Sequence, residues 1–334
     1  MTTPLLSVTD LRIALQTARG PAEAVRGIGF ELNKGETLGI VGESGSGKSL
    51  TALALMGLLP DGAATAGQVR YAGRNLLTAD EQELCTLRGN RLAMIFQEPM
   101  TSLNPLHRIG DQIAEPLQLH LGMSRQQARE RVIDLLDRVG IPNPRSRLDA
   151  YPHQMSGGQR QRVMIAMALA CDPDILIADE PTTALDVTIQ GQILDLIRRL
   201  VDDSGMALVL ISHDLGVIAE TVDRVLVMYA GRAVEAGPVH EVFARMAHPY
   251  ARGLFSAMPR IAAGQPHPRP QLPTIPGIVP DLQDLPAACA FADRCGLAEP
   301  RCRSEFPPAA VIGPAHHAEC WRTDITLNQT MAIP

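Results

Sequence analysis

The segment GESGSGKS, from Gly42 to Ser49, constrains this chain more than any other stretch of its sequence. It follows the apolar run TLGIV and precedes LTALALMGLL. Glycines in such a loop let backbone N–H groups curl around an anion, while Lys48 reaches terminal phosphates and the Ser49 hydroxyl can bind Mg²⁺. The order strand, glycine-rich loop, helix therefore predicts a nucleotide phosphate site in an α/β fold. The predicted contact residues are Gly42, Glu43, Ser44, Gly45, Ser46, Gly47, Lys48 and Ser49.

Further strands are predicted from apolar runs along the chain. LLSVTDLRIAL and GIGFEL lie before the loop, and DILIADE and ALVLISHD lie after it. Continuous apolar strands that alternate with helices indicate a parallel sheet buried on both faces. SRQQARERVIDLLDRVG predicts instead a helical insertion, with Ser124 and Gln127 as a capping box and one apolar face. That face comprises Val132, Leu135, Leu136 and Val139.

The net charge and the lengths of the apolar runs indicate which kinds of partner this chain can have. The net charge of −6 gives no support for nucleic-acid binding, which usually needs a concentrated positive field. No run reaches the ~18 apolar residues that a membrane span requires, and MTTPLLSVTDLRIAL has no positive leader pattern. We expect a chain that is cytosolic or peripheral on a membrane.

Two adjacent carboxylates end the apolar strand in ILIADEP. Side chains alternate along a strand, so Asp179 and Glu180 point in different directions and can take different roles. Asp179 is predicted to hold Mg²⁺, together with Ser49, either directly or through water. Glu180 is predicted to orient or deprotonate the water that attacks the γ-phosphate.

The segment MSGGQRQRVMIAMALA contains a second glycine-rich helix start, formed by Ser156, Gly157, Gly158 and Gln159. Such a helix end is a second anion site, and one chain cannot easily bring both to the same phosphate. Together with Gln97 in MIFQEP, ALD at 184–186 and His213 after LVLIS, the pattern resembles the ATP-binding cassette (ABC) ATPases over residues 1 to about 250.

The resemblance implies a fold and a set of roles. The fold is that of a P-loop NTPase with a parallel or mixed sheet core, an N-terminal antiparallel β subdomain and a helical subdomain at about 98–170. The Ser156–Gln159 segment of one subunit closes over the nucleotide of its neighbour, and Asp186 lies across that dimer seam. Gln97 senses Mg²⁺, and His213 contacts the γ-phosphate.

Two positions depart from the usual pattern of that family. Met155 replaces a leucine, a change that conserves volume. Between Met1 and Gly29 there is no aromatic residue to stack on adenine, and Phe30 is predicted to be a strand residue.

Repair and translation ATPases of the same family form the alternative class. Repair members carry long coiled coils and translation members carry two cassettes, whereas this chain has neither feature. EPMTSLNPLHRIGDQIAEPL resembles the docking region of importer ATPases for dipeptides, oligopeptides and nickel. The resemblance implies two membrane permease subunits, an external binding protein and a second, related ATPase at the cytoplasmic face of the inner membrane. A peptide substrate is expected, with nickel or glutathione as alternatives.

The C-terminal part is rich in proline and cysteine. We expect the cassette at 1–258, a proline-rich linker at 259–286 and a small module at 287–334. The module contains Cys289, Cys295, Cys302 and Cys320 and resembles the extension of peptide and nickel importer ATPases. The resemblance favours a [4Fe–4S] cluster, and structural zinc or free thiols are the alternatives.

Overall fold

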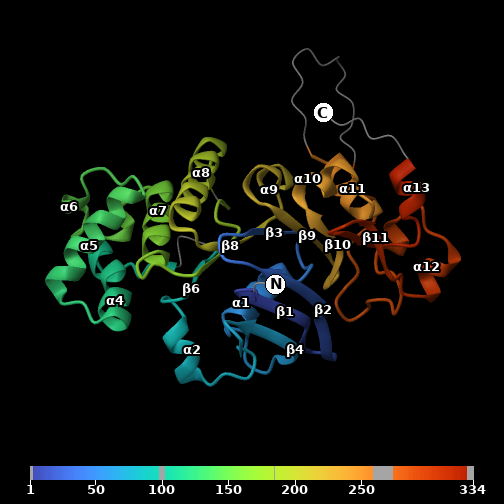
Figure 1. Cartoon of the computed structure of the whole chain (residues 1–334), viewed down its shortest axis with the longest axis horizontal. Helices are drawn as coiled ribbons and strands as arrows, with labels where there is room; N and C mark the ends of the chain where they lie inside the picture. The colour runs from blue at the N-terminus through green and yellow to red at the C-terminus, as the bar shows by residue number, and fades with distance from the viewer. Residues whose placement is uncertain (1–2, 98–101, 184, 259–273, 329–334) are drawn as a thin grey trace, which may run out of the picture.

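The computed structural model describes residues 3–97, 102–183, 185–258 and 274–328. Its centre is an eight-stranded sheet of order β11-β12-β10-β9-β3-β8-β7-β6 (Figure 1). The strands of this core sheet are β3 (Thr37–Val41), β6 (Leu92–Ile95), β7 (Ile175–Asp179), β8 (Ala207–Ser212), β9 (Arg224–Tyr229), β10 (Arg232–Pro238), β11 (Ala309–Gly313) and β12 (His316–Glu319). Strands β6, β7, β8, β3 and β9 pair in parallel, whereas β10, β12 and β11 pair antiparallel.

The parallel strands are apolar except at their ends because both of their faces are covered. Alternate residues of β7 enter two different cores: Ile175 and Ile177 pack toward the N-terminal sheet, and Leu176 and Ala178 pack toward the helices. All five residues of β7 and all six of β8 are buried. This confirms the predicted α/β fold with a mixed sheet at its core.

A second, four-stranded sheet covers one side of the core sheet. It has the order β2-β1-β4-β5 and is antiparallel (Figure 1, blue). Its strands are β1 (Leu6–Thr17), β2 (Gly20–Leu32), β4 (Ala64–Tyr71) and β5 (Arg74–Asn75). Phe30 lies within β2 and is buried, as the sequence predicts, so its ring cannot stack on a nucleotide base.

Helices cover the remaining faces of the core sheet. A group at one end (Figure 1, green) contains α4 (Ile109–Leu121), α5 (Arg125–Arg138), α6 (Pro144–Arg147) and α7 (Gly157–Ala168). The predicted capping box of Ser124 and Gln127 starts α5, and the predicted apolar face is buried. The other helices are α1 (Lys48–Leu55), α2 (Glu81–Leu87), α8 (Val187–Ser204), α9 (Leu215–Thr221), α10 (Val239–Ala244), α11 (Pro249–Ser256), α12 (Pro300–Ser304) and α13 (Thr323–Asn328).

The C-terminal part is joined to the core sheet. The hairpin β11–β12 pairs with β10, where Glu235 is opposite Ala318. Residues 274–286 contain no helix or strand and run back past the N-terminal hairpin, where Arg19 binds Asp284 at 2.9 Å. Most of the predicted linker, 259–273, lies outside the described residues, and the predicted domain boundaries stay a prediction.

Candidate functional site

The phosphate loop connects β3 to α1, as the sequence predicts. Gly42 has φ 154° and Gly47 has φ 99°. A Cβ at Gly42 would lie 2.2 Å from the Met228 carbonyl oxygen, and one at Gly47 would lie 3.0 Å from the Ala24 carbonyl oxygen. Glycine is therefore required at both positions, because the loop is pressed against β9 and β2.

Lys48 begins α1 and points back over the loop. Its Nζ donates to the carbonyl oxygens of Gly42 at 2.7 Å and Glu43 at 2.9 Å. Burial lowers the pKa of Lys48, an effect that the nearby carboxylates of Glu180 and Asp179 oppose. A cation held this way at the loop can exchange backbone carbonyls for phosphate oxygens when a nucleotide binds.

Asp179 ends β7 beside the loop and is 5% exposed. Burial raises its pKa, whereas a hydrogen bond with the Ser49 side chain and the charge of Lys48 lower it. One Asp179 oxygen is buried without a hydrogen-bond partner. A carboxylate with an unpartnered oxygen next to a serine hydroxyl is the donor set that Mg²⁺ takes, so these residues fit the predicted magnesium site.

Glu180 is the point where three side chains converge. Its Oε2 accepts from Gln97 Nε2 at 3.1 Å and from Thr183 Oγ1 at 3.0 Å, and it lies 3.4 Å from His213 Nδ1. The backbone of Glu180 has φ 47°, a conformation that L-residues rarely adopt and that clusters at functional sites. The structure thus brings together Glu180, Gln97 and His213, three residues predicted from motifs that are far apart in the sequence.

Thr183 was not among the predicted site residues. It lies three positions after Glu180 and donates to the same carboxylate oxygen. In the sequence, the threonine in TTAL looks like an ordinary turn residue. Only the structure, in which Thr183 lies beside the Glu180 carboxylate, shows that it is part of the site.

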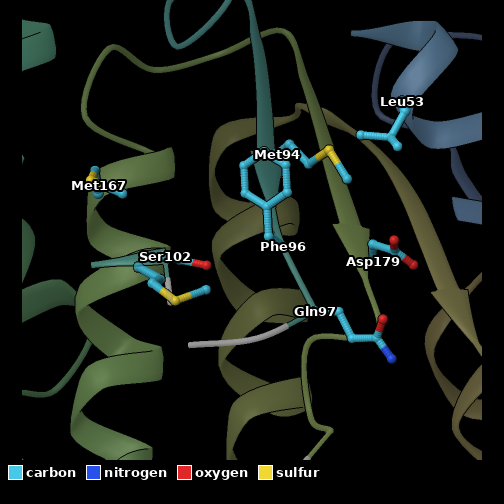
Figure 2. A pocket seen from close by; sticks show the side chains of 8 residues that line it. Leu53, Met94, Phe96, Gln97, Ser102, Met167 and Asp179 are labelled. Atoms are coloured by element: carbon cyan, nitrogen blue, oxygen red, sulfur yellow. The ribbon is translucent and has the colours of Figure 1, made fainter. Parts of the chain in front are cut away.

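A cavity of about 490 Å³ opens beside Gln97. Figure 2 shows Gln97 and Asp179 at one end of it, with Met167 on α7 and Ser102 at the other. Leu53, Met94, Phe96 and Met164 supply most of the remaining wall. Gln97 therefore lies between Glu180 and Asp179, the residues predicted to activate water and to bind magnesium, and a largely apolar hollow at the edge of the helical group.

The second predicted anion site lies away from the first. Ser156 caps α7 in a capping box with Gln159, and both residues, like Gly157, are partly or well exposed. Helix α7 packs on α4, α5, α8 and β6, whereas α1 packs on β2 and β7, and Figure 1 shows the two helices apart. Met155 is buried in the core below the cap.

Asp186 has a clear local role. Its side chain accepts from the Ile189 N–H at 3.0 Å and caps α8. A Cβ on Gly158 would lie 3.0 Å from Ile189, so the Ser156–Gln159 segment and the first turn of α8 share one surface.

The four C-terminal cysteines lie in one small module. The Cys289 N–H donates to the Cys302 carbonyl at 3.1 Å. Burial raises the pKa of the Cys289, Cys295 and Cys320 thiols, the last to about 12, and the neighbouring cysteines of the module raise it further. Among the described residues, no group of three or more His, Cys, Asp or Glu could hold a metal ion. The structure therefore does not support the predicted iron–sulfur cluster or its zinc alternative.

Comparison with known proteins agrees with this geometry. Residues 25–183 match the family model described as ABC transporter, and residues 234–302 match that described as Oligopeptide/dipeptide transporter, C-terminal region. A dimeric ATP-binding cassette solved in a post-hydrolysis state with ADP and Pi is 27% identical, with a TM-score of 0.63 over 70% of this chain and 98% of that one. In the described part of the chain, no helix is long and apolar enough to cross a bilayer.

Two curated relatives match nearly the whole chain. A probable peptide ABC transporter ATP-binding protein of Sinorhizobium fredii is 51% identical over 326 residues, which cover 97% of this chain and 96% of the relative. The oligopeptide transport ATP-binding protein of Salmonella typhimurium is 49% identical over 318 residues, which cover 95% and 93%. With the phosphate loop, the strand-end carboxylates and both family matches in place, this chain belongs to the ATP-binding subunits of ABC transporters, in the group that has the oligopeptide/dipeptide transporter C-terminal region.

Proposed function

We propose that this chain hydrolyses ATP to energise the uptake of peptides through separate membrane subunits. The convergence of Gln97, Thr183 and His213 on Glu180, next to the phosphate loop, is the observation that carries the hydrolytic part. The peptide part rests on the curated relatives, which are named as peptide and oligopeptide transport proteins.

Each residue of the site has a role that follows from its position. Loop N–H groups and Lys48 hold the phosphates, and Ser49 and Asp179 hold Mg²⁺, which supplies charge neutralisation on the phosphate oxygens. Glu180 is the group that orients water or accepts its proton. Gln97 and Thr183 hold the Glu180 carboxylate in position by hydrogen bonds. His213, which lies next to the same carboxylate, is the group that contacts the transferred phosphate.

The Ser156–Gln159 segment acts on the nucleotide of a neighbouring subunit. Support comes from its exposure and from its separation from the phosphate loop within one chain. The neighbour is a second, related ATPase, and Asp186 lies at the seam between the two. Two permease subunits and an external binding protein complete the importer, which places this chain at the cytoplasmic face of the inner membrane.

Besides ATP and Mg²⁺, we propose a [4Fe–4S] cluster as a cofactor in the C-terminal module. Its support is the presence of four cysteines in one module and the Leu297 and Arg322 N–H groups, which donate to Cys295 Sγ at 3.4 Å and Cys320 Sγ at 3.3 Å. Iron analysis after anaerobic purification tests it. Colourless protein without iron removes the cluster and leaves the ATPase proposal intact.

Glu180→Gln tests the hydrolytic part in the importer reconstituted with its membrane subunits. The amide cannot accept a proton, so turnover should fall by about 10²–10⁴ while MgATP still binds. Glu220→Gln, an exposed carboxylate on α9, is the matched control and should keep full turnover. Near-normal ATP hydrolysis by Glu180→Gln would remove Glu180 from the mechanism. Uptake of labelled peptides, compared with nickel and glutathione, tests the substrate.

A further inference from the structure

Glu43 places a carboxylate inside the phosphate-binding loop. It is the only acidic residue between Gly42 and Ser49. A carboxylate this close to a bound triphosphate would repel it, because like charges at short range disfavour one another. Something in the protein must therefore neutralise this carboxylate or direct it away from the nucleotide.

The neutralising group comes from the far end of the chain. Arg294 Nη1 donates to Glu43 Oε2 at 2.6 Å and Arg294 Nη2 donates to Glu43 Oε1 at 3.0 Å, a bidentate pair between residues 251 positions apart. The Arg294 side chain is 6% exposed. Paired hydrogen bonds of this fork-to-fork kind are both strong and geometrically specific.

Arg294 is itself held rigidly. It ends a short 3₁₀ turn, η2 (Ala292–Arg294), and is followed directly by Cys295. Its Nε donates to the Pro276 carbonyl at 2.9 Å, and its Nη1 lies 3.3 Å from the Tyr229 hydroxyl. The guanidinium therefore has a fixed position, and it fixes Glu43 in turn.

The same end of the loop has a second anchor. The Glu43 N–H donates to the Tyr250 hydroxyl at 2.8 Å, and Tyr250 is fully buried on α11. The rings of Tyr229, Tyr250 and Phe291 pack on one another at centroid distances of 4.6–5.4 Å. The aromatic cluster thus joins the core strand β9, the helix α11 and the C-terminal module beneath the loop.

We propose that Arg294 is a positioning residue of the nucleotide site, through which the C-terminal module neutralises Glu43 and holds the phosphate loop in its binding conformation. The module is then part of the ATP site. This inference rests on the proposed function only in that the loop binds ATP.

The chain offers a matched link that does not reach the loop. Arg232 on β10 donates from Nε and Nη2 to the two oxygens of Glu319 on β12, both at 3.0 Å. This pair also connects the module to the core sheet with bidentate geometry, although the Arg232 side chain, at 23% exposed, is less buried than that of Arg294. Loss of it loosens the module but leaves Glu43 neutralised.

The experiment measures MgATP affinity of the full chain by titration with a fluorescent ATP analogue. Arg294→Ala should weaken binding by about tenfold or more, because Glu43 is left unpaired beside the phosphates. Arg294→Ala combined with Glu43→Gln should recover to within about threefold of wild type, because the repelling charge is gone. Arg294→Lys keeps the positive charge but cannot form the bidentate pair, so its MgATP affinity should lie between those of wild type and Arg294→Ala. Arg232→Ala should bind like wild type.

Three outcomes overturn the proposal: wild-type affinity in Arg294→Ala, no recovery in the double variant, or an equal loss in Arg232→Ala. The double variant distinguishes positioning from general damage, because a merely unfolded loop is not rescued by a second substitution. Absence of MgATP binding by the wild-type chain, with no difference from Lys48→Ala, would instead refute the proposed function. Thermal melting of each variant, followed through Trp321 in the module, reports whether the module stays folded.

Discussion

His316→Ala should detach the C-terminal hairpin from the core sheet. His316 lies on β12, is 1% exposed, and its Nε2 is 2.7 Å from Glu235 Oε1 on β10. Glu235 also accepts from the N–H groups of Ala247 at 2.8 Å and His248 at 2.9 Å. Removal of one partner of a buried pair lowers the free energy of unfolding by roughly 3–5 kcal/mol. Because the Ala247 and His248 N–H groups still donate to Glu235, we expect a loss at the lower end, ~3 kcal/mol.

The assay is urea unfolding of the full chain. Trp321 is the single tryptophan and lies in the C-terminal module, so its fluorescence reports the module, while circular dichroism reports mainly the core. With a denaturant slope of ~3 kcal/mol/M, a loss of ~3 kcal/mol lowers the fluorescence midpoint by about 1 M.

His317→Ala is the matched control for this measurement. The neighbouring histidine is exposed, and its replacement should change stability by less than ~0.5 kcal/mol. Equal midpoints for the two alanine variants would refute the reasoning, since they would mean that the buried pair contributes nothing to docking of the hairpin.

Three further predictions follow from other parts of the chain. Burial lowers the pKa of His248 to about 3, so between about pH 6.5 and pH 3 this imidazole is protonated in the unfolded chain but not in the folded one. The free energy of unfolding in urea should therefore fall as the pH drops through this window, and it should fall less in His248→Asn. Gly42→Ala should prevent folding of the loop, whereas Gly45→Ala, with no atom within 4 Å of the new Cβ, should cost only about 1–2 kcal/mol of thermal stability. Ser156→Ala and Ser124→Ala remove equivalent caps worth ~1 kcal/mol each, but only Ser156→Ala should reduce ATP turnover of the assembled importer.

The features that sequence predicts well are those encoded within a few residues. The phosphate loop, the strand end at Asp179 and the cap at Ser124 each depend on local spacing, and each appears where the pattern places it. Family resemblance added Gln97 and His213, which local chemistry alone would not have selected. Their proximity to Glu180 follows from the parallel sheet, which brings strand ends to one edge.

The features that sequence does not predict depend on contacts between distant segments. Nothing near Glu43 indicates that its partner is Arg294, and nothing in the proline-rich C-terminal part indicates that β12 extends the core sheet. The metal prediction for the cysteines stays a proposal, because spacing says which thiols are close in sequence, whereas ligation depends on their arrangement in space, and the described residues show no group of three or more possible ligands.

The pairing of Glu43 with Arg294 also constrains the order of events during synthesis. The phosphate loop leaves the ribosome 251 residues before its partner, which at ~5–20 residues per second is an interval of about 13–50 s. During that time the Glu43 carboxylate lacks its cation and β10 lacks the strand that covers its edge. We expect the nascent cassette to bind ATP poorly until Arg294 has been synthesised and has paired with Glu43, so that chains without the C-terminal module do not become competent to enter a transporter.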